Sequence, residues 1–449
     1  DHVLTNDTIG STPLAWGTGS PRVLAELETP DDYTMVLRYQ HPKALFPYDV
    51  SRTTPFPPGH YLEQFHPDFT PLDELTKMAT DAGFSTWDQY YGNRNDYRVN
   101  LDLPVTHVWK ADTPISDELF IMGRNPYFWQ VDAEGKQLPY LDRLQNRRFE
   151  TPDVFNLWVL NGEIDYQERH VDVSNITLFK EGEEKGDYKV IMALRSWHAG
   201  FIPNMTCKNP KLRAFFQQRD ARIAMSYAMN RQEINDLVYD SMGTPRQYSP
   251  LEQSPQAYSK QANVYLEYDP DRANEMLDAL GYTERDAEGF RTYSDGSGET
   301  ISFTIEMFYA PGSPGEDTAQ MIIRYLADVG LKAQYQFSER SLYTERCQAN
   351  EVEASNWELD RTVVPIVDYG QWTNERGAYS RPWAGAWCLW RDSAGEDPNG
   401  EEPPEGHWQW TLWDLSDKIA VEPDEAKRNE MFWQVLDIWA EEIPLIGLL

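Results

Sequence analysis

The chain has 449 residues, which is too long for one compact core, so about two or three domains are expected. Acidic residues outnumber basic ones by 73 to 40, and the resulting net charge of −33 argues against binding to the phosphate backbone of a nucleic acid. Apolar residues make up 40% and charged residues 25%, as in a globular chain, and no run approaches the roughly 18 apolar residues of a membrane helix.

The first elements predicted along the chain are a β-hairpin and a helix. Apolar residues alternate through Val23–Tyr39 on both sides of a turn at Pro30–Asp32, which predicts two antiparallel strands. Apolar residues at helical spacing predict a helix over Leu72–Ala82, with Gly83 as its stop. The section Asn125–Asp165 is then predicted to mix turns and strands.

Two helices are predicted after Pro210. The first runs through Ala221–Ala228, where small and aromatic residues share one face. The second begins at Asn230, whose side chain is expected to cap the free N–H groups of the first turn. Glu233, three residues later, is expected to return a hydrogen bond to the N–H of the cap.

The clearest architecture lies between Asp269 and Phe337. Asp269 is expected to cap a helix that ends at Gly281. Alternating apolar residues over 301–307 and 331–337 predict two strands, and a helix over 319–326 connects them. A strand, a helix and a strand at this spacing form a βαβ crossover, which predicts a parallel strand pair in an α/β domain.

A last helix is predicted over Asp424–Ala440. Four apolar residues fall on its inward face: Phe432, Val435, Leu436 and Trp439. No internal repeat is present in the sequence.

Motifs of catalysis and of cofactor binding are absent from the sequence. The eight histidines form no HExxH motif or paired metal spacing, and no GxSxG, Walker or GxGxxG loop is present. The segments Asp132–Gly135 and Asp286–Gly289 faintly resemble calcium loops but lack the full ligand set, so tight turns are predicted there. We therefore expect no enzyme, no cofactor and no metal site.

The cysteine pattern indicates neither a zinc site nor a complete disulfide framework. Cys207, Cys347 and Cys388 are odd in number and form no CxxC pair. Three buried thiols are the preferred prediction, while one disulfide with a free thiol stays open. Cysteine usage consequently does not indicate a redox compartment.

Tryptophan is unusually frequent, with sixteen residues, more than half of them between Trp357 and Trp439. A dense group, Trp372, Trp383, Trp387 and Trp390, lies among Gly, Arg and Pro without a helix or strand period, which predicts a loop. Aromatic residues on loops favour ligand stacking, so this group is our first candidate for a binding site. Structural packing of the same rings is the alternative.

Four parts of the sequence, in this order and spacing, resemble the large solute-binding proteins of the oligopeptide- and dipeptide-binding family, family 5, of bacterial ABC importers. They are Arg124–Asp142, Asn161–Asp165, Asn209–Arg231 and Asp269–Tyr282. The resemblance extends along nearly the whole chain and is greatest to the long, Trp-rich branch that includes oligosaccharide binders. It implies a bilobal α/β fold of the periplasmic-binding-protein type II, in the three-region cluster of peptide binders.

The family plan also implies a division of the chain. Residues 1–100 would be the remainder of the accessory region of lobe 1, residues 101–175 the core of lobe 1, and residues 176–440 the α/β lobe 2. Residues 441–449 would return toward lobe 1. By the same comparison, the sequence is expected to be truncated at both ends.

The function implied by the resemblance is that of a substrate-binding subunit. It would capture an oligopeptide or an oligosaccharide between two closing lobes and deliver it to the membrane permease. A ligand-binding sensor or chaperone on the same scaffold is the main alternative, and a hydrolase is less favoured because no nucleophile motif is present. The family implies a monomer in the periplasm or outside the cell, with tethering through an upstream lipoprotein signal left open.

The resemblance also suggests which carboxylate contacts the ligand. Peptide-binding members carry an aspartate that pairs with the amino terminus of the peptide. The matching stretch is Trp357–Arg361, in which Asp360 is the better candidate, and Asp368 follows. The usual aspartate-aspartate-proline run is absent. The predicted ligand-binding residues are therefore Trp383, Trp387, Trp390, Trp372, Asp360, Asp368 and Trp357.

Overall fold

The computed structural model describes the chain except for residues 1, 5, 11–13, 19–22, 52–56, 195–197, 310, 358, 360–361, 376 and 380. The chain divides into two compact units. Unit 1 comprises Asp1–Ala15, Val50–Val171 and Leu178–Val190, and unit 2 comprises Trp16–Asp49, Asp172–Thr177 and Ile191–Leu449. Within the described residues, no helix is both long enough and apolar enough to cross a membrane.

Unit 1 contains short helices around a small apolar core. The helical elements are α2 (Gly59–Leu62), η2 (Glu63–Phe65), α3 (Leu72–Asp81) and α4 (Trp87–Arg94). Leu62, Phe65, Tyr91 and Leu103 are buried between them. The predicted helix over Leu72–Ala82 is confirmed as α3, and Gly83 ends it with a φ of +85°, a left-handed conformation that glycine adopts without strain.

A three-stranded antiparallel sheet follows in unit 1. Its strands, in spatial order, are β5 (Trp109–Ala111), β6 (Leu119–Arg124) and β7 (Arg143–Arg147). The predicted turn at Asp132–Gly135 lies in the β6–β7 connection, where the Asp132 side chain accepts hydrogen bonds from the backbone N–H groups of Glu134 and Lys136, each at 2.9 Å. Turns and strands are thus confirmed for this part of the section.

The prediction for Asn125–Asp165 was wrong in omitting a helix. Helix α5 (Pro152–Leu160) begins after Thr151, whose hydroxyl accepts a hydrogen bond from Val154 N–H at 3.4 Å. A threonine cap followed by proline is a helix start signal, and the aromatic and β-branched residues that follow obscured it. The shorter elements η3 (Val173–Asn175), α6 (Ile176–Glu181) and α7 (Glu183–Gly186) come next.

The predicted β-hairpin is confirmed, with its turn two residues further on. Strand β3 (Glu26–Asp31) pairs with β4 (Thr34–Arg38), so the turn residues are Asp32 and Tyr33. The turn moves because the Asp31 carboxylate accepts hydrogen bonds from Tyr33 N–H at 2.8 Å and from the Thr34 hydroxyl at 2.9 Å. The neighbouring elements are η1 (Leu14–Trp16), β1 (Gly17–Thr18), β2 (Val23–Leu24) and α1 (Phe46–Ser51).

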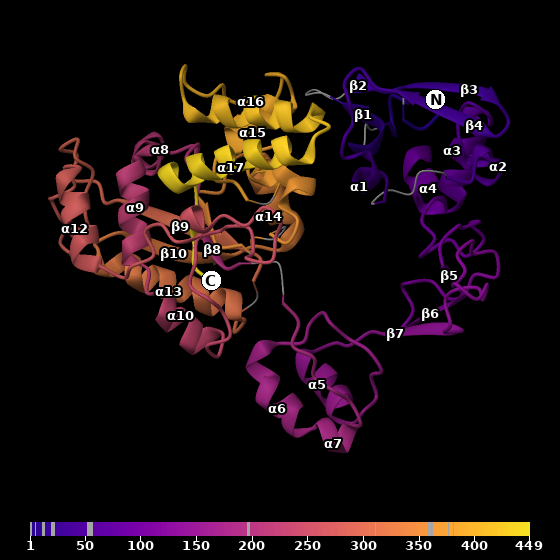
Figure 1. The fold of residues 1–449 in the computed structure, drawn as a ribbon, viewed down its shortest axis with the longest axis horizontal. Helices are drawn as coiled ribbons and strands as arrows, with labels where there is room; N and C mark the ends of the chain where they lie inside the picture. Colours follow the sequence, from indigo (N-terminus) through magenta and orange to yellow (C-terminus); the bar gives the residue numbers. More distant parts are fainter. Residues whose placement is uncertain are drawn as a thin grey trace. The chain divides into compact units, whose positions relative to one another are not determined.

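The main part of unit 2 is built on a five-stranded mixed sheet in the order β10-β9-β11-β8-β12. Figure 1 labels three of these strands, β8, β9 and β10, among the helices of this unit. Its strands are β8 (Gly200–Pro203), β9 (Ser302–Met307), β10 (Lys332–Phe337), β11 (Ala354–Ser355) and β12 (Ile446–Gly447). Strands β9, β10 and β11 are parallel, whereas β8 is antiparallel to both β11 and β12. The predicted βαβ crossover is confirmed as β9, α13 (Pro314–Asp328) and β10.

Helices cover both faces of this sheet. Phe303 of β9 packs edge to face on Phe216 of α8 (Pro210–Gln217), with ring centroids 5.1 Å apart. Glu306, on the opposite face of β9, accepts a hydrogen bond of 2.8 Å from Arg346 Nε of α14 (Arg340–Gln348). The carboxylate is buried, so this ion pair fixes α14 against the sheet.

The section after Pro210 holds three helices where two were predicted. They are α8 (Pro210–Gln217), α9 (Arg219–Ala228) and α10 (Arg231–Val238). Asn230 caps α10 as predicted, by accepting a hydrogen bond from Glu233 N–H at 3.1 Å. The Glu233 carboxylate instead accepts from the Tyr325 hydroxyl at 2.7 Å and pairs with Arg324, so it ties α10 to α13.

The helix predicted after Asp269 is confirmed as α12 (Pro270–Ala279), and the Asp269 carboxylate accepts a hydrogen bond from Arg272 N–H at 2.9 Å. The remaining helical elements of unit 2 are α11 (Ser259–Ala262), η4 (Pro365–Gln371), η5 (Gly377–Tyr379), α15 (Gly385–Asp392), α16 (Trp408–Val421) and α17 (Glu425–Glu442). Helix α17 confirms the last predicted helix. Residues 446–447 then form β12 beside β8, and the expected return toward lobe 1 stays a prediction.

Candidate functional site

The best candidate for a site lies at the carboxyl ends of the parallel strands β9, β10 and β11 of the unit 2 sheet. Strand β9 continues through α13 to β10 on one side of it, whereas β11, its neighbour on the other side, continues through η4 and helices α15 to α17 to β12, further away from β9. The segments that follow β9 and β11 therefore separate from each other. In open α/β sheets, ligands bind outside the carboxyl ends of the strands at such a switch point.

Two aromatic side chains flank this switch point. Phe308 directly follows β9, and Trp357 follows β11 by two residues. Their rings meet edge to face, with centroids 4.9 Å apart and an interplanar angle of 88°. Both are half-buried, so each ring is supported by the protein while part of it stays accessible. We call Phe308, Trp357 and the two arginines described next the aromatic edge.

Two guanidinium groups accompany these rings. Arg340, the first residue of α14, lies 4.9 Å from the Phe308 ring centroid and 5.5 Å from that of Trp357. Arg381 lies 5.5 Å from the Trp357 centroid and donates a hydrogen bond of 2.8 Å to Gln371 Oε1. The stacking holds both cations beside one tryptophan.

A buried amide lies next to the aromatic edge. Asn356 is 4% exposed and donates a hydrogen bond of 2.8 Å from Nδ2 to the carbonyl of Gly315, in the first turn of α13. Its Oδ1 atom accepts no hydrogen bond from any described residue. The Asn356 amide thus links the segment that follows β11 to α13, the helix that follows β9.

His198 precedes β8 and lies beside the segment that follows β11. Its backbone pairs with that of Leu359, and its imidazole Nε2 lies 3.3 Å from the Thr362 hydroxyl. Burial, reinforced by the charge of Arg246, lowers the pKa of His198 from 6.5 to about 3. The imidazole is therefore neutral at physiological pH.

The predicted site residues fall into two groups. Trp357 lies at the aromatic edge, and Asp368 lies in η4, in the chain that continues from β11. Asp368 is 5% exposed. Asp360 lies outside the described residues, between Trp357 and Asp368 in sequence. These three positions belong to one connection that begins at the switch point.

Trp372, Trp383 and Trp387 belong to the interior, because they are 0%, 1% and 2% exposed. Trp372 stacks on Tyr248 with centroids 4.1 Å apart at 5°, and its carbonyl accepts a hydrogen bond of 2.8 Å from Trp439 Nε1. The packing of these rings holds η4 against α17, and α15 against α16. Trp390 is half-buried and stacks on Trp413.

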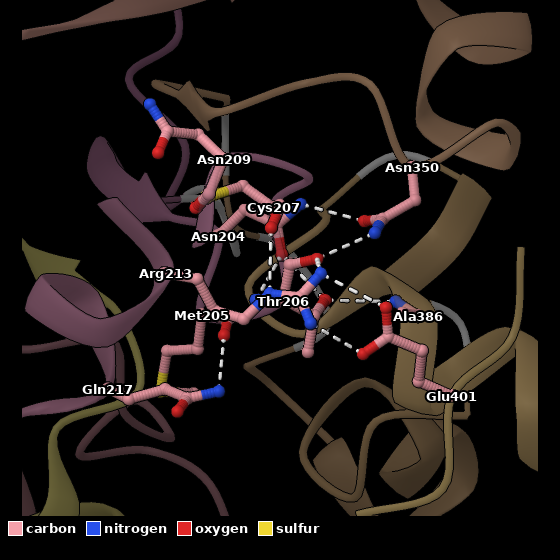
Figure 2. A network of polar contacts seen from close by, with 10 residues as sticks. All are labelled: Asn204, Met205, Thr206, Cys207, Asn209, Arg213, Gln217, Asn350, Ala386 and Glu401. Carbon is pink, nitrogen blue, oxygen red and sulfur yellow. Dashed lines mark hydrogen bonds and ion pairs between the residues drawn. The ribbon is translucent and has the colours of Figure 1, made fainter. Parts of the chain in front are cut away.

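The loop predicted for the tryptophan group was wrong for Trp387 and Trp390, which lie on helix α15. The helix begins at Gly385, where the local sequence offers no side-chain cap. Its free Ala386 N–H instead donates a hydrogen bond of 3.0 Å to the hydroxyl of Thr206, which follows β8 (Figure 2). A cap supplied from such a distance leaves no signal in the local sequence.

The segment that supplies this cap is held by a buried amide network, drawn in Figure 2. Asn204 Nδ2 donates to Asn350 Oδ1 and to the carbonyl of Val352, while Asn204 Oδ1 accepts from the N–H and the hydroxyl of Thr206, all at 2.9 Å. Asn350 Nδ2 returns a hydrogen bond of 2.6 Å to the Thr206 carbonyl. Arg213 donates a hydrogen bond of 3.2 Å to the Thr206 carbonyl and forms an ion pair with Glu401.

The other side chains considered in the sequence analysis, an aspartate turn and the three cysteines, have structural roles. The Asp286 carboxylate accepts hydrogen bonds from the N–H groups of Glu288 and Phe290, each at 2.9 Å, so the predicted turn is confirmed. The three cysteines are buried and none of them forms a disulfide, as preferred from their spacing. Within the described residues, no group of three His, Cys, Asp or Glu side chains is arranged to hold a metal ion.

Sequence reasoning missed Phe308, Arg340 and Arg381. The first two could have been found, because each comes directly after or shortly after a strand of the predicted parallel pair. Arg381 gives no such signal, since it reaches the edge from the segment before α15. Its place depends on the packing of that segment against Gln371 and Trp357.

Comparisons with known proteins agree on one family. Residues 1–372 match the family described as "Bacterial extracellular solute-binding proteins, family 5 Middle". The periplasmic alpha-galactoside-binding protein of Rhizobium meliloti (strain 1021) is 22% identical over 458 residues, covering 98% of this chain. The chain spans 60% of the length of that curated relative.

Two solved structures are also similar. An oligopeptide-binding protein OppA is 32% identical with a TM-score of 0.65, over 94% of this chain and 69% of that one. The periplasmic binding protein MelB from Agrobacterium fabrum C58, in complex with stachyose, is 17% identical with a TM-score of 0.72, over 99% of this chain and 64% of that one. The latter likeness concerns the fold, which is that of the type II periplasmic binding proteins.

Proposed function

Since the chain belongs to family 5 of the bacterial extracellular solute-binding proteins, we propose that it is the substrate-binding subunit of an ABC importer. It captures an oligopeptide or an oligosaccharide between two closing lobes and delivers it to the membrane permease. Family members are binding proteins, so no catalytic role is proposed. The protein acts as a monomer in the periplasm or outside the cell, either free or tethered through a lipoprotein signal upstream of this sequence.

The aromatic edge is the observation that carries this proposal. Half-buried rings at the switch point of an α/β sheet offer flat apolar surfaces where a ligand can displace water. A polar oligomer has few apolar faces, and a ring already fixed by its neighbours loses little side-chain entropy when it binds one. We therefore assign Trp357 the main stacking contact.

The proposed site is narrower than the one expected from the sequence. Trp357, Asp360 and Asp368 remain ligand contacts in the proposal, because they share the connection that leaves β11. Trp372, Trp383 and Trp387 are proposed to support that connection from the interior, and the half-buried Trp390 to support it by stacking on Trp413. The lobe boundaries given above stay predictions.

Thermal denaturation with added ligands tests the function. A ligand that binds only the folded protein raises its melting temperature. We expect either stachyose and raffinose or a set of synthetic oligopeptides to raise it in a saturable manner. If members of both classes fail at millimolar concentration, a solute-binding function at this edge is refuted.

The Asp360→Asn variant then separates the two ligand classes. A peptide whose amino terminus pairs with Asp360 should lose about 2 kcal/mol or more of binding free energy when the charge is removed. A sugar should lose less, because asparagine still accepts and donates hydrogen bonds. Calorimetric titration of the variant with the ligand found in the thermal screen measures this loss of binding free energy.

A further inference from the structure

The segment that carries Trp357 is held to strand β8 at both of its ends. Before it, Ser355 of β11 pairs with Ile202 of β8, and after it, Leu359 pairs with His198. Two hydrogen bonds close the second pair, from His198 N–H to the Leu359 carbonyl at 2.6 Å and from Leu359 N–H to the His198 carbonyl at 2.7 Å. Trp357 therefore lies at the middle of a short span that is fixed at two points.

The two pairs keep one register. Ser355 and Leu359 are four positions apart, and so are their partners, so no residue is inserted on either side. Trp357 consequently lies across from Gly200. Its side chain is on the same face as those of Ser355 and Leu359, because alternate residues of a strand share a face. Tyr343 packs on this face, with its hydroxyl 2.9 Å from the Ser355 hydroxyl and its ring centroid 5.7 Å from that of Trp357.

The Leu359 side chain depends on a glycine at position 200. It is 0% exposed and lies over Gly200. A Cβ atom on Gly200 would overlap Leu359 Cδ1 and would lie 3.3 Å from Leu359 Cγ. Leu359 thus fills the space that any larger residue at position 200 would take.

We propose that Leu359, seated on Gly200, is a positioning residue that sets the place of the Trp357 ring at the ligand site. This inference rests on the proposed function, in which Trp357 makes the main stacking contact. A ring attracts the face of a ligand only at van der Waals distance, so a displaced ring loses much of its contact. Leu359 acts through Trp357 and touches no ligand itself.

A double-mutant cycle tests the contact between Leu359 and Gly200. Gly200→Ala should displace the leucine, and Leu359→Ala should leave its place empty, so each should lower ligand affinity by about fivefold. The double variant should bind more tightly than either single variant, because the methyl group added at position 200 occupies part of the space that the leucine vacates. Calorimetric titrations with stachyose and with pentaalanine measure the affinities.

A second readout follows the Trp357 ring without any ligand. In the 449-residue chain labelled with fluorotryptophan, the fluorine resonance of Trp357 is assigned by its loss in Trp357→Phe. We expect both single variants to shift or broaden this resonance and the double variant to restore it. Gly182→Ala is the matched control in unit 1, since a Cβ atom on Gly182 would also meet a leucine methyl group, Leu160 Cδ2, at 2.8 Å. It should leave the Trp357 resonance in place.

The outcomes separate this inference from the proposed function. Lower affinity and a moved Trp357 resonance in each single variant, with recovery of both in the double variant, support it. Effects that simply add in the double variant overturn the contact, and unchanged affinity in the single variants overturns the positioning role, while the solute-binding function stands in both cases. If Gly200→Ala does not fold, an unmoved resonance in Leu359→Ala overturns the positioning role by itself. A natural chain that binds neither probe overturns the proposed function, and the role of Leu359 falls with it.

Discussion

Unit 2 contains two sets of tryptophans with opposite surroundings. Trp357 lies at the sheet edge, half-buried and flanked by Phe308 and by two arginines. Trp372, Trp383 and Trp387 lie within the helical layer at 2% exposure or less, packed on other rings. The dense tryptophan group therefore serves packing, whereas Trp357 lies where the proposed ligand site is expected, at the carboxyl ends of the parallel strands.

The two sets are connected through the chain itself. The segment that leaves β11 at Trp357 continues through η4 to Trp372, whose ring is fixed between Tyr248 and Trp439. The buried rings thus anchor the far end of the connection that carries the aromatic edge. Substitutions in the two sets should separate stability from ligand affinity.

The largest effect is expected for Trp383→Ala. Removal of a ring that is 1% exposed leaves a cavity and should reduce the free energy of unfolding by about 3–5 kcal/mol. Urea denaturation followed by circular dichroism measures the change. Trp129, which is 77% exposed, is the control, since its replacement by alanine should change stability by about 0.5 kcal/mol at most. An equal loss of unfolding free energy at the two positions would show that Trp383 does not contribute more to stability than an exposed tryptophan.

Asn204→Ala tests how the helical layer is held to the sheet. The change removes the hydrogen-bond partner of Asn350 Oδ1 and the acceptor of the Thr206 N–H and hydroxyl, at a cost of about 1–3 kcal/mol. The matched control is Asn263→Ala, because Asn263 is exposed and bonds only one carbonyl, that of Ser259. A melting temperature equal to that of the control would show that the network in Figure 2 does not stabilise the fold.

The buried His198 and the exposed His60 should differ in how they couple stability to pH. The folded state keeps His198 neutral down to about pH 3, whereas the unfolded chain binds a proton below about pH 6.5. The stability contributed by the neutral imidazole is present above pH 6.5 and is lost as the pH falls, by about 1.4 kcal/mol per pH unit. Denaturation midpoints across this range should therefore fall more steeply for the natural protein than for His198→Gln. The exposed His60→Gln variant should follow the natural protein, and parallel curves for all three would contradict the prediction.

The smallest effect on stability, with a clear effect on affinity, is expected for Trp357→Ala. The ring is half-buried, so its loss should destabilise the fold much less than that of Trp383. Ligand affinity should fall by about tenfold, equivalent to about 1.4 kcal/mol. Calorimetry on Trp357→Ala beside a milder core variant, Trp387→Phe, compares the two sets directly. Affinity lost in Trp387→Phe but kept in Trp357→Ala would place the ligand at the helical layer instead.

Much of unit 2 could be predicted from sequence because its signals are local. The period-2 strands at 301–307 and 331–337 and the caps Asp269 and Asn230 depend on residues at most a few positions apart. Alternation reflects which side of a strand is buried, and a cap satisfies N–H groups one turn away. These elements form where the pattern places them, although the Glu233 carboxylate accepts from the Tyr325 hydroxyl and the Asn230 side chain in place of the Asn230 backbone N–H.

The sequence by itself determined the family and the βαβ crossover. Only the tertiary structure decided that α15 is a helix, because its first turn is capped by Thr206 from another part of the chain. It also decided which tryptophans are buried and which arginines stand beside Trp357. Contacts between residues far apart in sequence leave no period to detect, so burial and proximity were settled by packing alone.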